Sequence, residues 1–205
     1  MIQMKMMEVA GEGGQVYYGG SQEWYHTTRQ KRAGCGPTAA SNLVWYIART
    51  KPHLAALWDV TRTGQEDFLC LMEEMFQHIT PGRGGVNTTE KFTAGALRFG
   101  EKQGAPLRAN VMEVPTTFAK RPTPDEVESF ILAAMEADFP VAFLNLSNGG
   151  VKNLDRWHWV TIMALEPHSM NAVICDQGDC LKIDLGRWLK ATILGGGFVW
   201  LDGKA

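Results

Sequence analysis

The stretch Gly34-Cys35-Gly36-Pro37-Thr38-Ala39-Ala40 opens the most strongly patterned segment of the chain. Apolar side chains recur there at the spacing of one buried helix face: Ala39, Ala40, Leu43, Val44 and Ile47. Pro37 suits the first turn of a helix, where its missing N–H group costs nothing. The sequence therefore predicts a helix from Gly36 to about Thr50, with a cysteine at its N-terminus.

Three further helices and a group of strands are expected. Periodicity and capping residues predict helices over Glu66 to Ile79, Thr88 to Gln103 and Thr123 to about Ala137. After Pro140, short apolar runs predict strands over Val141 to Leu146, Trp157 to Leu165, Ala172 to Asp176, Leu181 to Leu185 and Gly197 to Leu201. Residues 11–34, rich in glycine and polar groups, are expected to be irregular.

Helices that precede an antiparallel sheet in the chain indicate an α+β fold. We expect one domain over residues 1–205, with a helical part over about 36–138 and a β-meander part over about 140–202. A chain of 205 residues, 45% of them hydrophobic and 20% charged, is typical of one globular domain.

Composition also restricts the partners and the location. The formal net charge of -2 argues against nucleic-acid binding, because phosphates are bound by basic surfaces. No apolar run approaches the ~20 residues that span a bilayer, which argues against a membrane protein. Residues 1–8 lack the plan of a signal peptide, so the expected location is the cytoplasm.

The four cysteines predict neither a metal site nor a disulfide framework. They are Cys35, Cys70, Cys175 and Cys180, and none of them forms a Cys-x-x-Cys pair. We therefore expect no metal and no cofactor. Cys70 lies between Phe68 and Met72 in an expected helix and is predicted to be a buried structural residue.

Cys35 has the surroundings of a nucleophile. The unpaired N–H groups and partial positive charge at a helix N-terminus stabilise a thiolate, which is the reactive form of cysteine. Gly34 and Gly36 allow a sharp turn and the close approach of a substrate backbone. The N–H group of Cys35 is expected to point toward a bound carbonyl oxygen, as one half of an oxyanion hole.

A reactive thiolate needs a histidine as its base, and that histidine needs a third group to orient it. Of the five histidines, His158 alone lies early in an expected strand. A hairpin centred on Pro167 places Asp176 opposite His158, because each lies nine residues from the turn. Asn145 is a competing orienting residue, although its sequence surroundings favour a loop.

Three motifs together resemble the papain-like superfamily of cysteine peptidases. They are Gly34-Cys35-Gly36-Pro37-Thr38-Ala39-Ala40, His158-Trp159-Val160-Thr161-Ile162 and Ile174-Cys175-Asp176. The chain resembles in particular the bacteriocin-processing, double-glycine peptidase branch and its stand-alone bacterial relatives. The resemblance implies a nucleophile helix packed on an antiparallel sheet. It also implies Cys35 as nucleophile, His158 as general base and then acid, and Asp176 as the orienting group.

The resemblance further implies a glutamine upstream of the cysteine, whose side-chain N–H group completes the oxyanion hole. Gln22, in Gln22-Glu23-Trp24, resembles the Gln-x-x-Trp-type start of stand-alone relatives, with a shorter spacing. Gln30 lies five residues before Cys35, close to the other usual spacing. Gln22 is slightly favoured.

These features predict a cysteine-dependent hydrolase, namely a peptidase that forms a thioester acyl-enzyme on Cys35. Trp24, Trp157 and Trp159 are expected to wall its substrate cleft. One alternative is an acyltransferase on the same scaffold, in which an amine or thiol replaces water. Another is a papain-like binding module that has lost catalysis. The expected partner is a peptide or another acyl substrate, and the sequence does not specify an oligomeric state.

Overall fold

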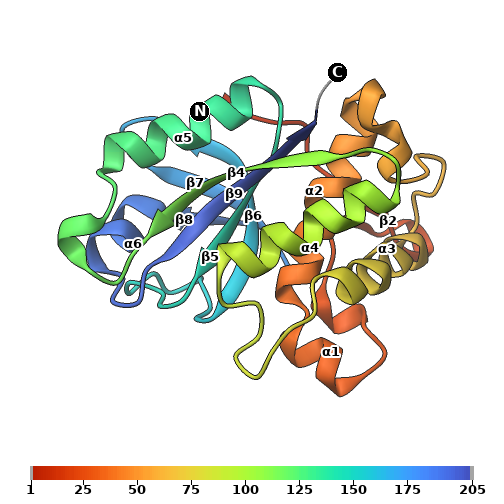
Figure 1. Ribbon diagram of the computed structural model, residues 1–205, viewed down its shortest axis with the longest axis horizontal. Coiled ribbons are helices and arrows are strands. Elements are labelled where there is room, and N and C mark those ends of the chain that lie inside the picture. The colour runs from red at the N-terminus through yellow and green to blue at the C-terminus, as the bar shows by residue number, and fades with distance from the viewer. Residues whose placement is uncertain (1, 204–205) are drawn as a thin grey trace.

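A curved antiparallel sheet runs through the molecule, with helices on both of its faces (Figure 1). The computed structural model describes residues 2–203. The main strands are β4 (Leu107–Val114), β5 (Val141–Asn145), β6 (His158–Glu166), β7 (Asn171–Asp176), β8 (Asp179–Asp184) and β9 (Gly196–Gly203). Their order is β4-β9-β5-β6-β7-β8, and the short strand β1 (Ile2–Gln3) pairs with the far end of β6. The α+β fold with a large antiparallel sheet is confirmed.

Helices cover the sheet from two sides. On one face, α2 (Cys35–Thr50) packs on β5 and β6, and α4 (Thr89–Lys102) packs on β4 and β9. On the other face, α5 (Pro124–Glu136) packs on β5 and β6, and α6 (Leu185–Ala191) packs on β7. A further helix, α3 (Gln65–His78), contacts α2 and α4.

Aromatic contacts to neighbouring positions of the sheet identify the two faces. Trp159 of β6 stacks on Phe92 of α4 with ring centroids 4.2 Å apart. Phe143 of β5, which stands opposite Val160, contacts Trp188 of α6 edge to face. Because both faces are covered, every residue of β5 is buried, and its sequence is apolar from Val141 to Leu144.

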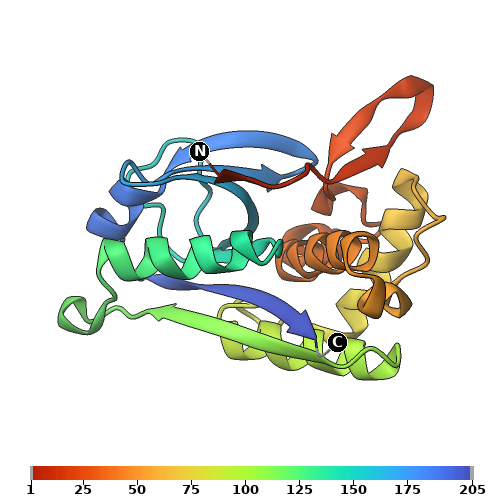
Figure 2. The ribbon, with the colours of Figure 1, turned by 90° about the horizontal axis from the view of Figure 1, so that it is seen from above.

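The segment before α2 has more regular structure than expected. It contains a hairpin of β2 (Glu8–Ala10) and β3 (Val16–Tyr18), which projects beyond the sheet (Figure 2). Two 3-10 helices, η1 (Glu12–Gly14) and η2 (Gln22–Trp24), and the helix α1 (Thr28–Ala33) also lie there. The expectation of an irregular segment over residues 11–34 is therefore wrong. These elements are too short to produce a recognisable periodicity.

The four predicted helices are present, with ends close to those expected. Thr88 caps α4 by accepting a hydrogen bond from the Lys91 N–H. Thr123 and Glu126 form a reciprocal capping box at the start of α5. The residues expected to form the buried face of α2, from Ala39 to Ile47, are all buried in one continuous hydrophobic core.

The expected division into a helical part and a β-meander part is wrong in three places. β4 lies within the segment expected to be helical, because only its end residues Leu107 and Val114 are buried and no apolar run marks it. α6 follows β8 directly, where Asp184 caps it by accepting from the Arg187 N–H. In addition, β9 does not continue the meander but inserts between β4 and β5.

Within residues 2–203, no helix combines the length and the apolar character needed to cross a lipid bilayer.

Candidate active site

Cys35 is the first residue of α2, and Gly34 precedes it as the N-cap. The first hydrogen bond of the helix runs from the Thr38 N–H to the Gly34 carbonyl oxygen, at 2.9 Å. The N–H groups of Cys35 and Gly36 come before this donor and have no acceptor within the helix. Cys35 is partly exposed and lines three adjoining cavities. The thiol is thus accessible at a helix N-terminus, as the sequence predicted.

The glycines that flank Cys35 are explained by close packing. A Cβ atom on Gly34 would lie 2.4 Å from the Tyr25 ring, and one on Gly36 would lie 2.8 Å from the Val86 side chain. Neither glycine lines a cavity that contains Cys35. Both glycines were expected to contact a substrate backbone. In the structure they instead allow neighbouring side chains to pack closely against the start of α2.

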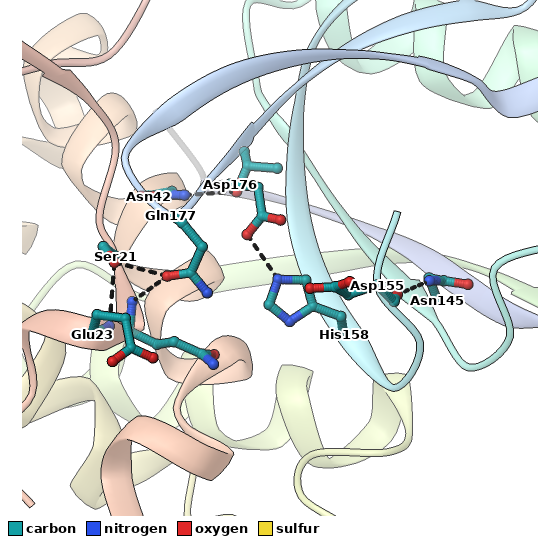
Figure 3. Close-up of polar contacts among 10 residues, drawn as sticks. Ser21, Glu23, Asn42, Asn145, Asp155, His158, Asp176 and Gln177 are labelled. Atoms are coloured by element: carbon teal, nitrogen blue, oxygen red, sulfur yellow. Dashed lines mark hydrogen bonds and ion pairs between the residues drawn. The ribbon is translucent and has the colours of Figure 1, made fainter. Parts of the chain in front are cut away.

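His158 and Asp176 form a direct side-chain pair (Figure 3). Nε2 of His158 lies 2.7 Å from Oδ1 of Asp176, and only 8% and 12% of the two side chains are exposed. Burial by itself lowers the pKa of His158, but the hydrogen bond to Asp176 and the contact with Cys35 together raise that pKa to about 10. The imidazole is therefore positively charged at neutral pH. Because Asp176 holds Nε2, Nδ1 is the ring nitrogen left for Cys35.

The route by which His158 and Asp176 meet differs from the predicted one. The turn between β6 and β7 is longer than a turn centred on Pro167, because Glu166 pairs with Asn171. That change alone would place Asp176 on the face opposite to His158. A β-bulge at Met163 adds one residue to β6 and restores the alternation.

Beyond the bulge, Thr161 pairs with Cys175, so Asp176 is a diagonal neighbour of His158. The predicted opposite pairing is therefore wrong, although the predicted contact is present.

The two candidate glutamines occupy different environments. Gln22 lies in η2 and lines a small cavity together with Cys35, His158 and Asp176. Its Oε1 atom is buried without a hydrogen-bond partner among the described residues. Gln30 instead completes the capping box of α1, where its Oε1 accepts from the N–H and hydroxyl of Thr27. Gln30 lines none of the cavities that contain Cys35.

Gln177 is a site residue that the sequence did not reveal. It follows Asp176 at the tip of the β7–β8 hairpin, where it and Gly178 both have positive φ values of 50° and 82°. Its Oε1 accepts from the Ser21 hydroxyl at 2.7 Å and from the Gln22 N–H at 3.1 Å. Gln177 thus fixes the backbone of Gln22, and Figure 3 shows Gln177 beside the His158–Asp176 pair. The paired positive φ values suit an Asn-Gly-like turn, and the dipeptide Gln177-Gly178 was the sequence signal that could have identified the hairpin.

Asn42 ties the same segment to α2. It lies two helical turns after Cys35, and its Oδ1 accepts from the Gly20 N–H at 2.9 Å. Its Nδ2 donates to the Thr161 hydroxyl of β6 at 3.0 Å. A single buried amide therefore joins α2, β6 and the segment that carries Gln22. The row of Cys35, Thr38 and Asn42 at helical spacing was the available signal.

The three tryptophans have three different positions. Trp157 is 52% exposed and lines two cavities that contain Cys35. Trp159 is buried against Phe92 and lines only the small inner cavity. Trp24 packs against Phe68 and lines none of the three, so the structure does not bring it to Cys35. Of the three rings, that of Trp157 is the one exposed beside the clefts.

Asn145 is the last residue of β5 and stands opposite His158 in the sheet, not in a loop. Its side chain donates to the Asp155 carbonyl oxygen and accepts from Trp188 Nε1 at 2.8 Å. Because these bonds occupy the amide, Asp176 and not Asn145 contacts the imidazole.

Of the remaining cysteines, Cys175 lines the small inner cavity with Cys35, whereas Cys70 and Cys180 line none of the three cavities. Cys70 is exposed, so its predicted burial is wrong, since it falls beside the buried stripe of α3. Cys175 and Cys180 stand opposite each other across β7 and β8, and both are free thiols. Among residues 2–203, no group of three or more His, Cys, Asp or Glu side chains is arranged to hold a metal ion.

Comparison of the chain with protein-family models gives no match, and comparison with curated proteins gives none either. The functional interpretation therefore depends on the geometry and chemistry of the site.

Proposed function

We propose that the protein is a papain-like cysteine hydrolase that cleaves peptide bonds through a thioester formed on Cys35. The principal support is one arrangement: an accessible thiol at a helix N-terminus shares a cavity with an imidazole whose far nitrogen is held by a carboxylate. This set of groups is what an activated thiol nucleophile requires. It also makes a binding module without catalysis the weaker interpretation.

The positive charge of His158 supports the first chemical step. An imidazolium beside the sulfur favours the thiolate, and the thiolate attacks the carbonyl carbon of the substrate. The carbon–nitrogen bond then breaks while His158 transfers its proton from Nδ1 to the leaving amine. A water molecule next gives a proton to His158 and attacks the thioester, which releases the acid and restores the thiolate.

Two donors are available for the negative oxygen that develops during both steps. The Cys35 N–H is free of any acceptor within α2, and the Gln22 side chain lines the same cavity, where its Oε1 has no hydrogen-bond partner among the described residues. The Nε2 group of the same amide is the atom that can donate to a substrate oxygen. In this proposal Gln22, and not Gln30, completes the oxyanion hole.

Labelling with iodoacetamide followed by peptide mapping tests the nucleophile. We expect Cys35 to react faster at neutral pH than the exposed thiols Cys70 and Cys180. Cys70 is the plain internal control, because the hydrogen bond with Cys175 lowers the pKa of Cys180. A His158→Ala substitution should slow labelling of Cys35 only. Equal rates at the three thiols in the wild-type protein would contradict the proposal.

Product analysis separates hydrolysis from acyl transfer, because both use the same thioester. The wild-type protein and a Cys35→Ala variant are incubated with a peptide library, with and without an added small amine. Products that carry the amine indicate an acyltransferase, whereas free acids alone indicate a hydrolase. Cleavage by the Cys35→Ala variant at the wild-type rate would exclude Cys35 as the nucleophile.

A further inference from the structure

A cleft with a cavity volume of about 530 Å³ opens beside Cys35, His158 and Gln22. Its outer wall is the loop between β5 and β6, from which Lys152 and Arg156 line the cleft. Arg32, at the end of α1, lines it from the other side. The cleft therefore receives cationic side chains from two segments that are far apart in the sequence.

These three cations have no anionic partner among the residues that the structure describes. Among residues 2–203, neither Arg32 nor Lys152 nor Arg156 forms an ion pair or a side-chain hydrogen bond. By contrast, Lys31 next to Arg32 pairs with Glu23. One carboxylate, that of Asp155, also lines the cleft, so the cations outnumber it.

The local charge is opposite in sign to that of the whole chain, which has a formal net charge of -2. Cationic groups in a cleft with low-dielectric walls concentrate anions there more strongly than the same groups on a flat surface. Guanidinium groups in particular bind carboxylates through two parallel hydrogen bonds.

Trp157 connects this cleft with a second one. The second cleft has a volume of about 300 Å³, is walled by the glycine-rich segment 82–85, and shares Cys35, Arg32 and Trp157 with the first. Trp157 has a φ of 55°. A positive φ is unusual for a bulky residue, and residues with such strained backbone angles are often found at functional sites. A chain that passes over Cys35 from one cleft to the other therefore passes the Trp157 ring and the Arg32 guanidinium.

We infer that this cleft selects acyl substrates that carry a carboxylate close to the scissile bond, bound by Arg32, Lys152 and Arg156. The inference rests on the proposed hydrolase function and specifies its substrate class as acidic peptides. The carboxylate has two possible sources, an Asp or Glu side chain or the C-terminus of the peptide. Both present the same chemistry to the three cations.

Binding is tested without catalysis by using the Cys35→Ala variant. The probes are fluorescent pools of eight-residue peptides that contain Glu, Gln or Lys among otherwise random residues, each made with a free or an amidated C-terminus. We expect the Glu pool to bind about 10-fold or more tightly than the isosteric Gln pool, and the Lys pool to bind weakest. A preference that survives amidation assigns the carboxylate to a side chain, and one that disappears assigns it to the C-terminus.

Variants that remove one charge at a time identify the residues responsible for the preference for Glu over Gln peptides. Arg32→Gln, Lys152→Gln and Arg156→Gln in the Cys35→Ala background should each reduce it, and the triple variant should abolish it. Arg29→Gln is the matched control, because Arg29 is exposed on the same helix as Arg32 but does not line the cleft. Added salt should weaken binding of the Glu pool more than that of the Gln pool.

The same pools given to the wild-type protein separate the two proposals. Cleavage with equal rates for Glu and Gln peptides, together with equal binding, would overturn the carboxylate preference and leave the hydrolase intact. Selective binding of the Glu pool without any cleavage would support the cleft and count against the hydrolase. Selective binding and selective cleavage of Glu peptides support both.

Discussion

Nε2 of His158 lies 2.7 Å from Oδ1 of Asp176, although the two residues are diagonal and not opposite in the sheet. The pair is mostly buried, and it holds a positive charge next to the candidate nucleophile. The pair therefore contributes to the stability of the fold as well as to the proposed chemistry.

The charge on His158 predicts a specific dependence of stability on pH. The folded-state pKa is about 10, above the ordinary value of 6.5, so the imidazolium stabilises the folded state. This contribution is complete below pH 6.5 and is lost as the pH rises toward 10. In Asp176→Asn, burial should dominate and the pKa of His158 should fall. Urea unfolding of both proteins across this pH range should give curves that converge at high pH; parallel curves would contradict the assignment.

Gln22 and Gln30 provide a matched pair of substitutions, of which one is expected to reduce activity and the other to reduce stability. Gln22→Ala should lower kcat/KM by about 10²-fold or more, because an oxyanion donor is lost, and should not destabilise the fold. Gln30→Ala should leave kcat/KM near the wild-type value but cost about 1 kcal/mol of stability, because a capping box is broken. Steady-state kinetics and urea unfolding measure the two effects. If Gln30→Ala alone lost activity, the choice of Gln22 would be wrong.

Gln177→Gly, at the tip of the β7–β8 hairpin, is expected to reduce activity without reducing stability. Glycine accommodates the positive φ of this position, so the turn should persist, while the hydrogen bonds to Ser21 and Gln22 are removed. We expect kcat/KM to fall by about 10-fold, with little change in the free energy of unfolding.

Ser21→Ala removes one of the two hydrogen bonds and should have a smaller effect. The double variant should add little to Gln177→Gly, because the two side chains act through one contact. Full additivity of the two effects would exclude this coupling.

Asn42→Ala should destabilise the fold by about 1–3 kcal/mol, because it leaves the Gly20 N–H without its acceptor in a buried position. Ser41→Ala is a suitable control, since Ser41 is also buried in α2 but bonds only within that helix. Thermal unfolding of the two variants gives the comparison. An equal loss of stability in both would show that the bridge to Gly20 and Thr161 adds nothing.

Helical periodicity was a sufficient guide to α2 and to the position of Cys35 within it. The apolar stripe from Ala39 to Ile47 is buried in the core, and Pro37 marks the first turn, so the local pattern and the tertiary structure agree. The contact between His158 and Asp176 was also predicted, but from a turn that was too short and a strand without the β-bulge. The effects of these two errors on the face occupied by Asp176 cancel. Turn length and bulges are set by packing between strands, which a single sequence does not display.

Residues that act through distant contacts were not predictable in the same way. The sequence around Gln177 and Asn42 does not reveal their partners, Gln22 and Gly20, which belong to another part of the chain. β4 was missed for a related reason: it lies at the edge of the sheet, so few of its side chains are buried and its alternation is weak.

β9 has a consequence for the biogenesis of the protein. It is the strand that joins β4 to β5, yet its residues 196–203 are synthesised after all the other strands of the sheet. A nascent chain on the ribosome that lacks these residues cannot connect β4 to the rest of the sheet, and such late, long-range pairing is slow to form. The sheet is therefore completed only when residues 196–203 have been synthesised, although Cys35, His158 and Asp176 all precede them in the chain.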